Sequence, residues 1–326
     1  MIRLVSACRA NQTMWDIRTN MWCVTLLLIA VVSCNAESFE LKTAELSPQT
    51  VSRIVGGVET TVESYPFIVQ VLYNAQFYCG GSLLTSRHVL SAAHCFVNDF
   101  GYVLPANRFA IRMGTTFLNT GGSLHQASQV IVHESYNNPS RDNDVAVVVL
   151  SSAATLSSSV QFAVLGARGQ ELPDNTTVTA VGWGRTHVNN TMPSTVLNEV
   201  TVMKVNRSVC EDRYRLLEEI HSVPFPVTNT MICAGILDVG GKDACGGDSG
   251  GPLLYGNVQV GVTSWGWSCA EPTWPGVYAR VANYTDWIEA KISLSSLQIQ
   301  QYNSAGISRV GAVTLLTPIL FLILNL

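Results

Sequence analysis

The sequence predicts an all-β protein, and three observations carry this prediction. The composition is that of a folded globular protein, with 47% hydrophobic and 13% charged residues, which excludes disordered, collagen-like and coiled-coil chains. Short apolar runs separated by Gly, Asn, Pro and Ser recur along the chain, for example at 67–72, 145–150, 178–181 and 258–263. Only 284–292 has a helical pattern. We therefore expect a β-sandwich or β-barrel architecture, as one large domain or as two barrels.

Charge and motif content exclude several classes of partner. The formal net charge of the 326 residues is −4, and no basic stripe is present for a phosphate backbone, so nucleic acid is not an expected partner. The sequence contains no CxxC pair and no HExxH motif, so a zinc site is disfavoured. We expect no metal and no other cofactor.

The first element along the chain is a predicted secretory leader. The apolar run 24–32 (VTLLLIAVV) follows Arg18 and precedes a small-x-small pattern, so we expect cleavage after Ala36. A signal anchor that stays in the membrane is the alternative, but the run is about half of the roughly 20 residues that a span needs. Translation from Met14 instead of Met1 would give a leader of more usual length. The mature chain is therefore expected outside the cell.

Cysteine usage agrees with a secreted protein. Three of the nine cysteines lie in the leader, and removing it leaves an even set of six. Such a set in a secreted chain predicts three disulfides, although six cysteines allow fifteen pairings and spacing alone does not choose among them. The six are Cys79, Cys95, Cys210, Cys233, Cys245 and Cys269.

Glycosylation sequons give weaker support for the same compartment, because Asn-X-Ser/Thr triplets also arise by chance. Glycans on these asparagines are expected only if the chain passes through the secretory pathway. The four sequons begin at Asn175, Asn189, Asn206 and Asn283.

Three separated segments carry residues with catalytic chemistry. Ser249 stands among glycines in 247–252 (GDSGGP), and such a loop lets backbone amides approach a substrate carbonyl beside a nucleophile. The second segment contains His94, and the third contains Asp144. Each feature alone is typical of a Gly-rich turn, a structural histidine or a turn carboxylate. Together they supply a nucleophile, a base and a carboxylate that orients the base, which favours a hydrolase.

The order and spacing of these segments resemble the trypsin-like serine proteases of the chymotrypsin fold. The resemblance covers Ile54 to about Ile292. It rests on seven motifs, which are IVGG at 54–57, SAAHC at 91–95, DNDVAV at 142–147, GWG at 182–184, CGGDSGGP at 245–252, SWG at 264–266 and PGVY at 275–278.

The resemblance implies an architecture and a mechanism. The fold would be two six-stranded Greek-key β-barrels with the catalytic residues in the cleft between them, followed by a C-terminal helix. Ser249 would be the nucleophile, His94 the general base and later the general acid, and Asp144 the residue that fixes the imidazole tautomer. The amides of Gly247 and Ser249 would hold the oxyanion. The resemblance also pairs the cysteines as Cys79 with Cys95, Cys210 with Cys233, and Cys245 with Cys269.

Substrate preference follows from the position of Asp243, six residues before Ser249. In similar proteases this position is the floor of the primary pocket, where a carboxylate pairs with a substrate Arg or Lys. Ala244 departs from trypsins, which often have Ser there; without the hydroxyl a lysine ammonium loses a partner, whereas a guanidinium fork still engages Asp243. The other substrate-binding residues that the resemblance implies are Ser264, Trp265, Gly266 and Gly276.

Activation is expected at Arg53, directly before Ile54. Cleavage there would create an Ile54 amine that pairs with Asp248, and the ion pair would order the oxyanion loop because a buried carboxylate is costly without a partner. The segment 37–53 contains no cysteine, so the released pro-peptide should be lost. The loop 114–130 contains no Asp or Glu, so the calcium site of some relatives should be absent.

The C-terminus carries a predicted membrane signal. Residues 310–326 are an apolar run of 17, preceded by the small residues of 303–306. This is the arrangement of a glycosylphosphatidylinositol attachment signal, with Ser304 the expected attachment residue, although the polar spacer is shorter than usual. A transmembrane helix is the alternative, but the run is marginal in length, Pro318 interrupts it and no basic anchor follows.

The sequence thus predicts a secreted zymogen of a serine endopeptidase that cuts after Arg or Lys, tethered to the outer face of the plasma membrane. Its partners would be protein substrates, an activating protease and protein inhibitors. A catalytically inactive homologue that serves as an extracellular binding module is the alternative, but such homologues usually lose a triad residue. The expected domains are a leader at 1–36, a pro-segment at 37–53, a protease domain at 54–292, a stalk at 293–303 and an anchor signal at 304–326.

Overall fold

The computed structural model describes residues 55–301. The predicted leader, the pro-segment, the cleavage pair Arg53 and Ile54, and the anchor signal at 304–326 lie outside the described residues. Within 55–301 no helix combines the length and the apolar character that a membrane span requires.

Six antiparallel strands close the first barrel in the order β2-β3-β4-β7-β6-β5. Because β5 returns to pair with β2, the first four strands form a Greek key. The strands are β2 (Ile68–Tyr73), β3 (Gln76–Thr85), β4 (His88–Ser91), β5 (Phe109–Met113), β6 (Ser123–Val132) and β7 (Ala146–Leu150).

The first hairpin shows how local sequence sets the strand register. Tyr73 pairs with Gln76, so the loop between β2 and β3 consists of Asn74 and Ala75 alone. Both loop residues have positive φ angles, 50° and 65°. Two central residues in this region are characteristic of a type I′ turn, whose twist matches that of the strands it joins.

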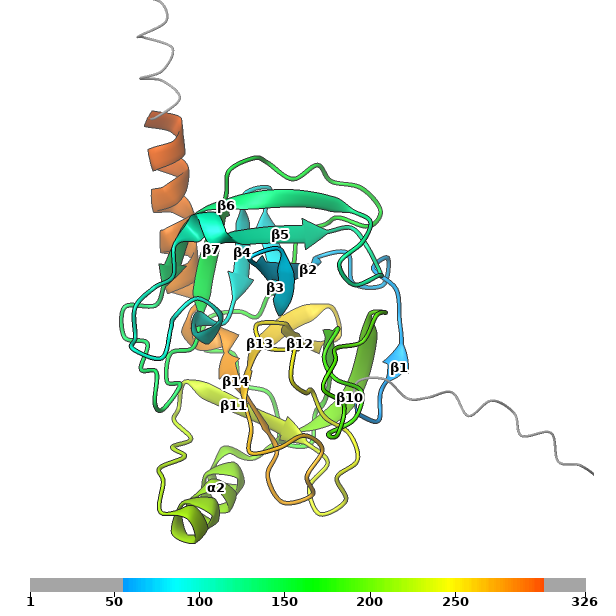
Figure 1. The fold of residues 1–326 in the computed structure, drawn as a ribbon. Helices are drawn as coiled ribbons and strands as arrows, with labels where there is room; N and C mark the ends of the chain where they lie inside the picture. The colour runs from blue at the N-terminus through cyan, green and yellow to red at the C-terminus, as the bar shows by residue number, and fades with distance from the viewer. Residues whose placement is uncertain (1–54, 302–326) are drawn as a thin grey trace, which may run out of the picture. The chain divides into compact units, whose positions relative to one another are not determined.

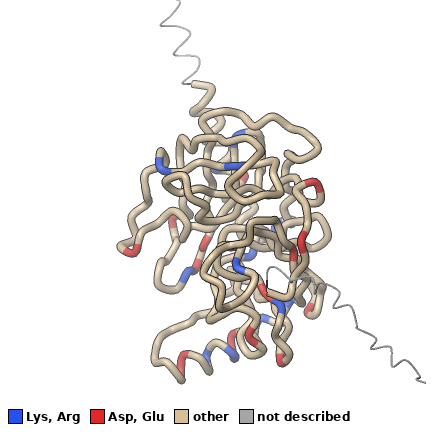
Figure 2. The backbone as a smooth tube through the Cα atoms, turned by 45° about the vertical axis from the view of Figure 1, so that its right-hand side comes forward, with Lys and Arg blue, Asp and Glu red and all other residues tan. Residues whose placement is uncertain are grey.

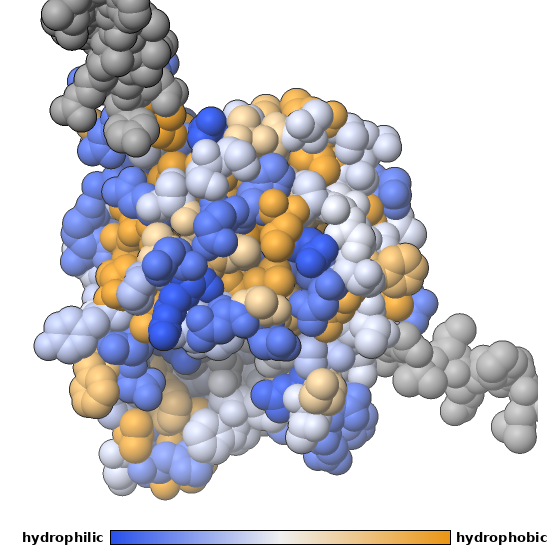
Figure 3. All heavy atoms as spheres, turned by 45° about the horizontal axis from the view of Figure 1, so that its top comes forward, coloured by the Kyte–Doolittle hydropathy of each residue, from blue (hydrophilic) through white to orange (hydrophobic). Residues whose placement is uncertain are grey.

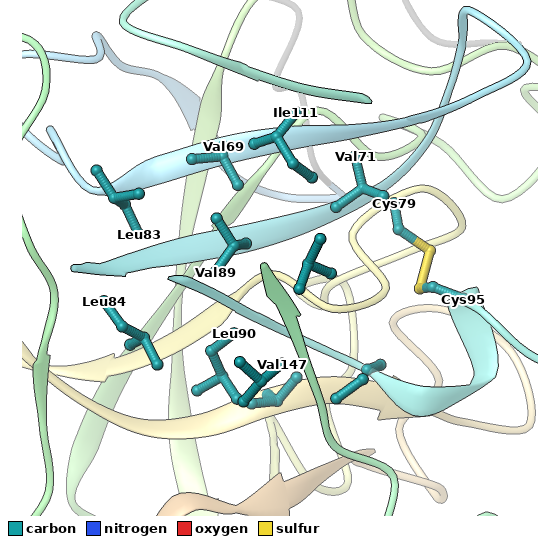
Figure 4. Close-up of a cluster of buried hydrophobic side chains, with 14 of the residues drawn as sticks. Val69, Val71, Cys79, Leu83, Leu84, Val89, Leu90, Cys95, Ile111 and Val147 are labelled. Atoms are coloured by element: carbon teal, nitrogen blue, oxygen red, sulfur yellow. A yellow bond between two sulfur atoms is a disulfide. The ribbon is translucent and has the colours of Figure 1, made fainter. Parts of the chain in front are cut away.

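The interior of the first barrel is filled by branched and aromatic side chains. Val69 from β2, Ile111 from β5 and Val147 from β7 have no exposed surface. Figure 4 shows these side chains converging, with the disulfide between Cys79 and Cys95 beside them. This disulfide ties β3 to the short turn η1 (Ala93–Cys95), so the first barrel rigidly positions the segment that carries His94.

A second barrel repeats this topology, and Figure 1 shows it below the first. Its strands pair in the order β9-β10-β11-β14-β13-β12, and β12 returns to β9 as β5 returns to β2. The prediction of two six-stranded Greek-key barrels is confirmed. The strands are β9 (Thr177–Gly182), β10 (Asn198–Val205), β11 (Met231–Gly235), β12 (Pro252–Tyr255), β13 (Val258–Trp265) and β14 (Gly276–Arg280), with short β1 (Val58–Glu59) on β10 and β8 (Val164–Leu165) on β13.

The predicted C-terminal helix is present and is longer than its sequence pattern, since it continues from 285 to 301. Ile288 is buried in the core of the first barrel. The Ser295 hydroxyl lies 2.8 Å from Nε2 of His88 in β4. Burial, together with the nearby charge of Arg87, lowers the pKa of His88, so the ring favours its neutral form at this contact.

A second helix corrects the prediction that only 284–292 is helical. Helix α2 (Arg207–His221) begins after Asn206, whose side chain accepts hydrogen bonds from the amides of Ser208 and Val209. Its buried residues Cys210, Tyr214 and Leu217 recur at helical spacing. Two signals, the N-cap and this spacing, were therefore available in the sequence. Two short 3₁₀ turns, η2 (Ala106–Arg108) and η3 (Val281–Asn283), complete the elements of 55–301.

Charged and apolar residues are mixed on the surface. Figure 2 shows positive and negative residues interspersed along α2, where Arg207 pairs with Glu211. On the face drawn in Figure 3, hydrophobic residues lie in small groups among hydrophilic ones. The face drawn in Figure 3 shows no broad apolar surface of the kind that marks a docking face, and Figure 2 shows no long run of one charge sign along the described chain. The cavities are therefore the better candidates for a site.

Candidate active site

Strand pairing brings His94 and Asp144 together. Strands β4 and β7 are antiparallel neighbours, and Ser91 at the end of β4 is opposite Ala146 at the start of β7. The turn that follows β4 and the loop that precedes β7 therefore meet at one edge of the first barrel. His94 lies in that turn and Asp144 in that loop.

The two side chains make close contact. Nδ1 of His94 is 2.7 Å from Oδ2 of Asp144, and the His94 amide donates to Oδ1 at 2.8 Å. Ser264 donates its hydroxyl proton to the same Oδ2 at 2.5 Å. The arrangement suits a neutral imidazole that donates from Nδ1 and keeps Nε2 for proton transfer.

Asp144 is buried, with only 1% of its surface exposed. Burial alone would raise the pKa of its carboxyl, but the charge and the hydrogen bonds of His94, with the hydrogen bond from Ser264, hold the pKa below its usual value. Asp144 therefore stays ionised and can stabilise a positive charge on His94.

The segment with Ser249 reaches from the second barrel onto the first. The Gly80 amide in β3 donates to the Ser249 carbonyl at 2.8 Å. Gly250 has φ +78°, and a Cβ there would lie 2.2 Å from the Ser91 hydroxyl oxygen and 3.1 Å from the Ala92 nitrogen. Only glycine permits this approach, which brings Ser249 next to the β4–η1 segment that carries His94.

Asp248 is buried under the same loop. Its carboxylate accepts hydrogen bonds from the amides of Gly184, at 2.7 Å, and Cys245, at 2.9 Å. A Cβ on Gly182 or Gly184 would lie 2.2 Å from an oxygen of the Asp248 carboxylate. The Asp248 side chain therefore fits because both of these positions are glycine. Burial raises the pKa of Asp248 to about 6. Within residues 55–301 no ion pair includes Asp248.

A cavity of about 340 Å³ opens beside Ser249. It gathers every substrate-binding residue expected from the sequence, and the lining includes Asp243, Ala244, Ser264, Trp265, Gly266 and Gly276. A Cβ on Gly276 would lie 2.8 Å from Oδ1 of Asp243, so a larger residue there would cover the carboxylate. The cavity therefore extends from Ser249 to Asp243, and glycine at 276 leaves the Asp243 carboxyl accessible from it.

Asp243 is the one carboxylate that lines this cavity. It is 3% exposed, and its Oδ2 accepts a hydrogen bond from the Ala270 amide at 3.1 Å. Its Oδ1 has no hydrogen-bond partner among the described residues. Burial raises its pKa to about 8, with the nearby charge of Asp248 adding to the shift. A cation in the cavity would stabilise the ionised form and reverse this shift.

The three disulfides brace this region with the pairing that the resemblance implies. Cys79–Cys95 holds η1, Cys245–Cys269 joins two walls of the cavity, and Cys210–Cys233 joins α2 to β11. The sulfurs of Cys79 and Cys95 lie close to a ring nitrogen of His94, but as a disulfide they are not thiolate ligands for a metal.

Three contacts were not expected from the sequence. Ser264 was expected only as a substrate-binding residue, yet it also binds Asp144. The Arg141 side chain donates from Nη1 to the Ser264 carbonyl at 3.0 Å, and Arg185 lines the cavity. No sequence pattern could have indicated these contacts, because each joins segments that are distant in the sequence and meet only in the folded protein.

Known proteins resemble this chain over the same region. The protein-family model described as Trypsin matches residues 54–288. Trypsin CFT-1 from Choristoneura fumiferana is 43% identical over 274 residues, which cover 82% of this chain and 98% of that protein. Alkaline trypsin C from Manduca sexta is 42% identical over 247 residues, which cover 74% and 91%. A trypsin from Phaedon cochleariae is 35% identical over 268 residues, which cover 82% and 98%.

Proposed function

The chain belongs to the trypsin family and is a serine endopeptidase of the chymotrypsin fold, and from this premise we propose that it cleaves protein chains after Arg or Lys with Ser249, His94 and Asp144 as its catalytic residues. The observation that carries the specificity is Asp243, a buried carboxylate whose Oδ1 has no partner within 55–301 and which lines the cavity beside Ser249.

The hydrogen bonds of His94 support the catalytic assignment. The Ser249 hydroxyl oxygen attacks the scissile carbonyl while Nε2 of His94 accepts its proton. Asp144 holds Nδ1 and stabilises the resulting imidazolium, and Ser264 helps to fix the Asp144 carboxylate. His94 then gives the proton to the leaving amine, and water releases the acyl group by the same steps in reverse.

The loop before Ser249 supplies the oxyanion donors. Gly247 has φ +103°, a conformation that glycine adopts readily and that orients the loop amides. Within residues 55–301 no recorded hydrogen bond occupies the amides of Gly247 or Ser249, so both can donate to a developing oxyanion. A Cβ on Gly247 would lie 3.1 Å from Cα of Gly184, which shows how closely the GWG segment supports this loop.

Asp243 explains the preference for a basic side chain. A substrate guanidinium that reaches Asp243 gives Oδ1 the partner it lacks and holds the carboxylate ionised. Ala244 lines the cavity without a hydroxyl, so a lysine ammonium, whose charge is compact and strongly hydrated, gains fewer partners there. We therefore expect Arg to be preferred over Lys.

Activation by cleavage after Arg53 is part of the proposal. The described chain begins beside the cavity, since the Val55 carbonyl accepts a hydrogen bond from the Asp243 amide at 3.1 Å. A Cβ on Gly56 would lie 2.1 Å from the Gly241 carbonyl oxygen. An amine on Ile54, one residue earlier, would thus form close to the Asp248 loop. An ion pair with Asp248 would stabilise its ionised form and order the oxyanion amides.

Secretion and surface tethering complete the proposal. The leader and the three disulfides support an extracellular site of action. Asn175 and Asn189 are exposed and suit glycans. The Nδ2 of Asn206 instead donates to Asp174, so a glycan attached at this nitrogen would compete with that contact. The apolar run at 310–326 supports a lipid anchor at Ser304.

The decisive experiment is a peptide-library profile of the activated ectodomain, residues 54–303. The proposal expects cleavage after Arg and Lys, with Arg preferred, and loss of cleavage in Ser249→Ala. An ectodomain that is correctly folded and cleaved at Arg53 but hydrolyses no peptide would instead support the inactive binding module.

A further inference from the structure

We propose that Arg185 is a second specificity residue, which binds an acidic side chain of the substrate close to the bond that is cut. The inference rests on the proposed function, because it requires the substrate to occupy the cavity between Ser249 and Asp243. It adds a carboxylate as a second recognition element beside the basic residue that fills the pocket.

The first observation is the space that Gly246 leaves for Arg185. A Cβ on Gly246 would lie 2.6 Å from both Nε and Nη2 of Arg185 and 2.9 Å from its Cζ. The φ angle of Gly246 is outside the positive range, so the backbone conformation does not itself require glycine. The missing side chain at 246 is what lets the guanidinium rest against this loop.

The second observation is the place of Arg185 on the substrate cavity. Its side chain lines the same cavity as Asp243 and Ser249. Its amide donates to the Gly246 carbonyl at 2.8 Å, so the backbone of Arg185 is fixed to the segment that leads to the nucleophile. The guanidinium therefore lies within reach of substrate residues next to the one that enters the pocket.

The third observation is the unused binding capacity of this guanidinium. Among the described residues, the guanidinium makes one hydrogen bond, from Nη1 to the Asn190 carbonyl at 3.4 Å. No ion pair of residues 55–301 includes Arg185, whereas Arg213 and Arg280 pair with Asp238 and Glu171. An arginine carries five N–H donors in a planar fork, and a carboxylate is the side chain that matches this fork.

Charge complementarity then defines the substrate class. Asp243 presents a carboxyl group that a cation in the cavity would hold ionised, and Arg185 places a positive charge on the cavity lining. A peptide with a basic residue at the cleaved bond and an acidic residue nearby satisfies both groups. A second basic residue at that nearby position would instead be repelled by Arg185.

The test uses peptides with Arg at the cleaved bond and either Glu or Gln at one of three positions on each side. The readout is the ratio of kcat/KM for the Glu peptide to that for its Gln twin. We expect a ratio of about 5 to 10 at one position, or at two adjacent positions, in the activated protein. The ratio should fall as salt is raised, because a partly exposed ion pair is screened.

Three variants locate the effect. Arg185→Gln should bring the ratio to about one, and Arg185→Lys should give an intermediate value because the charge remains but the fork is lost. Gly246→Ala should also lower the ratio, and it should have no further effect in the Arg185→Gln background. Arg87→Gln is the matched control, since Arg87 donates to the Leu150 and Ser151 carbonyls on the first barrel, and its ratio should equal that of the unmodified protein.

The ratio separates this inference from the proposed function. A change in the catalytic groups alters kcat/KM for the Glu peptide and the Gln peptide by the same factor, so it cancels in their ratio. Cleavage after Arg with equal Glu and Gln rates at every position would overturn the role of Arg185 and leave the proposed function intact. A Glu preference that survives Arg185→Gln would overturn it as well. Absence of any cleavage after Arg would overturn the proposed function itself.

Discussion

Oδ2 of Asp144 accepts two hydrogen bonds, one from His94 at 2.7 Å and one from the Ser264 hydroxyl at 2.5 Å. His94 and Asp144 belong to the first barrel, whereas Ser264 lies in β13 of the second. The orientation of the His94 ring is thus coupled to the packing of one barrel on the other. The same strand also lines the cavity beside Ser249, so the shape of this cavity and the orientation of His94 depend on one element.

Removal of the nucleophile or the base should abolish hydrolysis. Ser249→Ala and His94→Ala should each lower kcat by a similar factor, on the order of 10⁶, because the two groups act as one unit. The measurement is turnover of an Arg peptide by the activated ectodomain, with circular dichroism as the control for folding. Undiminished turnover in Ser249→Ala would mean that another group is the nucleophile.

Replacement of Asp243 should change the substrate preference. Asp243→Ser should lower kcat/KM for Arg and Lys peptides by roughly 10³ or more, because the buried charge that pairs with the substrate is lost. A Phe peptide, which makes no such ion pair, serves as the control and should lose far less. Ala244→Ser should lower the ratio of kcat/KM for the Arg peptide to kcat/KM for the Lys peptide. A preference for Lys or Phe in the unmodified protein would contradict this account of the pocket.

The buried carboxyl of Asp248 should make the precursor less stable as pH rises. Its folded-state pKa of about 6 exceeds the ordinary value, so its favourable contribution is present at acidic pH and is lost as pH rises through that value. The free energy of unfolding of Arg53→Gln should therefore fall between pH 4 and pH 7, by roughly 3 kcal/mol from this group.

The control for this effect is Arg53→Gln combined with Asp248→Asn. In this double variant the free energy of unfolding should decrease less between pH 4 and pH 7, because the titrating carboxyl is gone. Equal pH dependence with and without Asp248 would show that the carboxyl is not responsible. The same Arg53→Gln protein should be an inactive zymogen, and full activity in it would contradict a role for the Ile54 amine.

Activity of the cleaved enzyme should fall in alkali as the Ile54 amine loses its proton. Pairing with Asp248 would raise the amine pKa above the unperturbed value of about 7.7 to 8.0, so the contact is present below that value and is lost as pH rises through the raised one. The measurement is the alkaline limb of kcat/KM for an Arg peptide. Acetylation of the Ile54 amine should remove activity at every pH, whereas retained activity would argue against the ion pair.

The carboxylate of Asp248 should not tolerate a side chain at Gly184. A Cβ there would lie 2.2 Å and 2.7 Å from its two oxygens, so Gly184→Ala should lower the free energy of unfolding by about 1 to 3 kcal/mol and reduce activity. Gly166→Ala is the matched control, since its nearest contact is the end of the Gln170 side chain at 3.3 Å. Equal destabilisation by both changes would remove the special role of Gly184.

The anchor signal should be dispensable for catalysis. Every residue assigned to the site lies upstream of 303, so truncation after Asn303 should give a soluble, fully active protease. On intact cells that express the untruncated gene product, a phosphatidylinositol-specific phospholipase should release the anchored enzyme into the medium. Activity that stays on phospholipase-treated cells would favour a tail span, and an inactive truncated protein would show that the tail contributes to folding.

The family, and with it the two-barrel fold, could be predicted from the sequence, because each of the motifs around His94, Asp144 and Ser249 is contiguous and the motifs keep a specific order. The positions of several strands could also be predicted, since the bounds of β2, β7, β9 and β13 each agree with those of a predicted apolar run to within one or two residues. Helix α2 was missed although its N-cap and the spacing of its buried residues are local signals.

The contacts that shape the site could not be predicted from the sequence, because they form between distant segments of the folded chain. Ser264 and Asp144 are 120 residues apart in sequence, and Arg141 and Ser264 are 123 apart, yet both pairs are hydrogen-bonded. Arg185 meets Gly246 because two loops of the second barrel pack together. Local pattern and propensity fix the path of each strand, but side chains from distant segments acquire neighbours only when the barrels close and pack, and those neighbours set burial, pKa and available space.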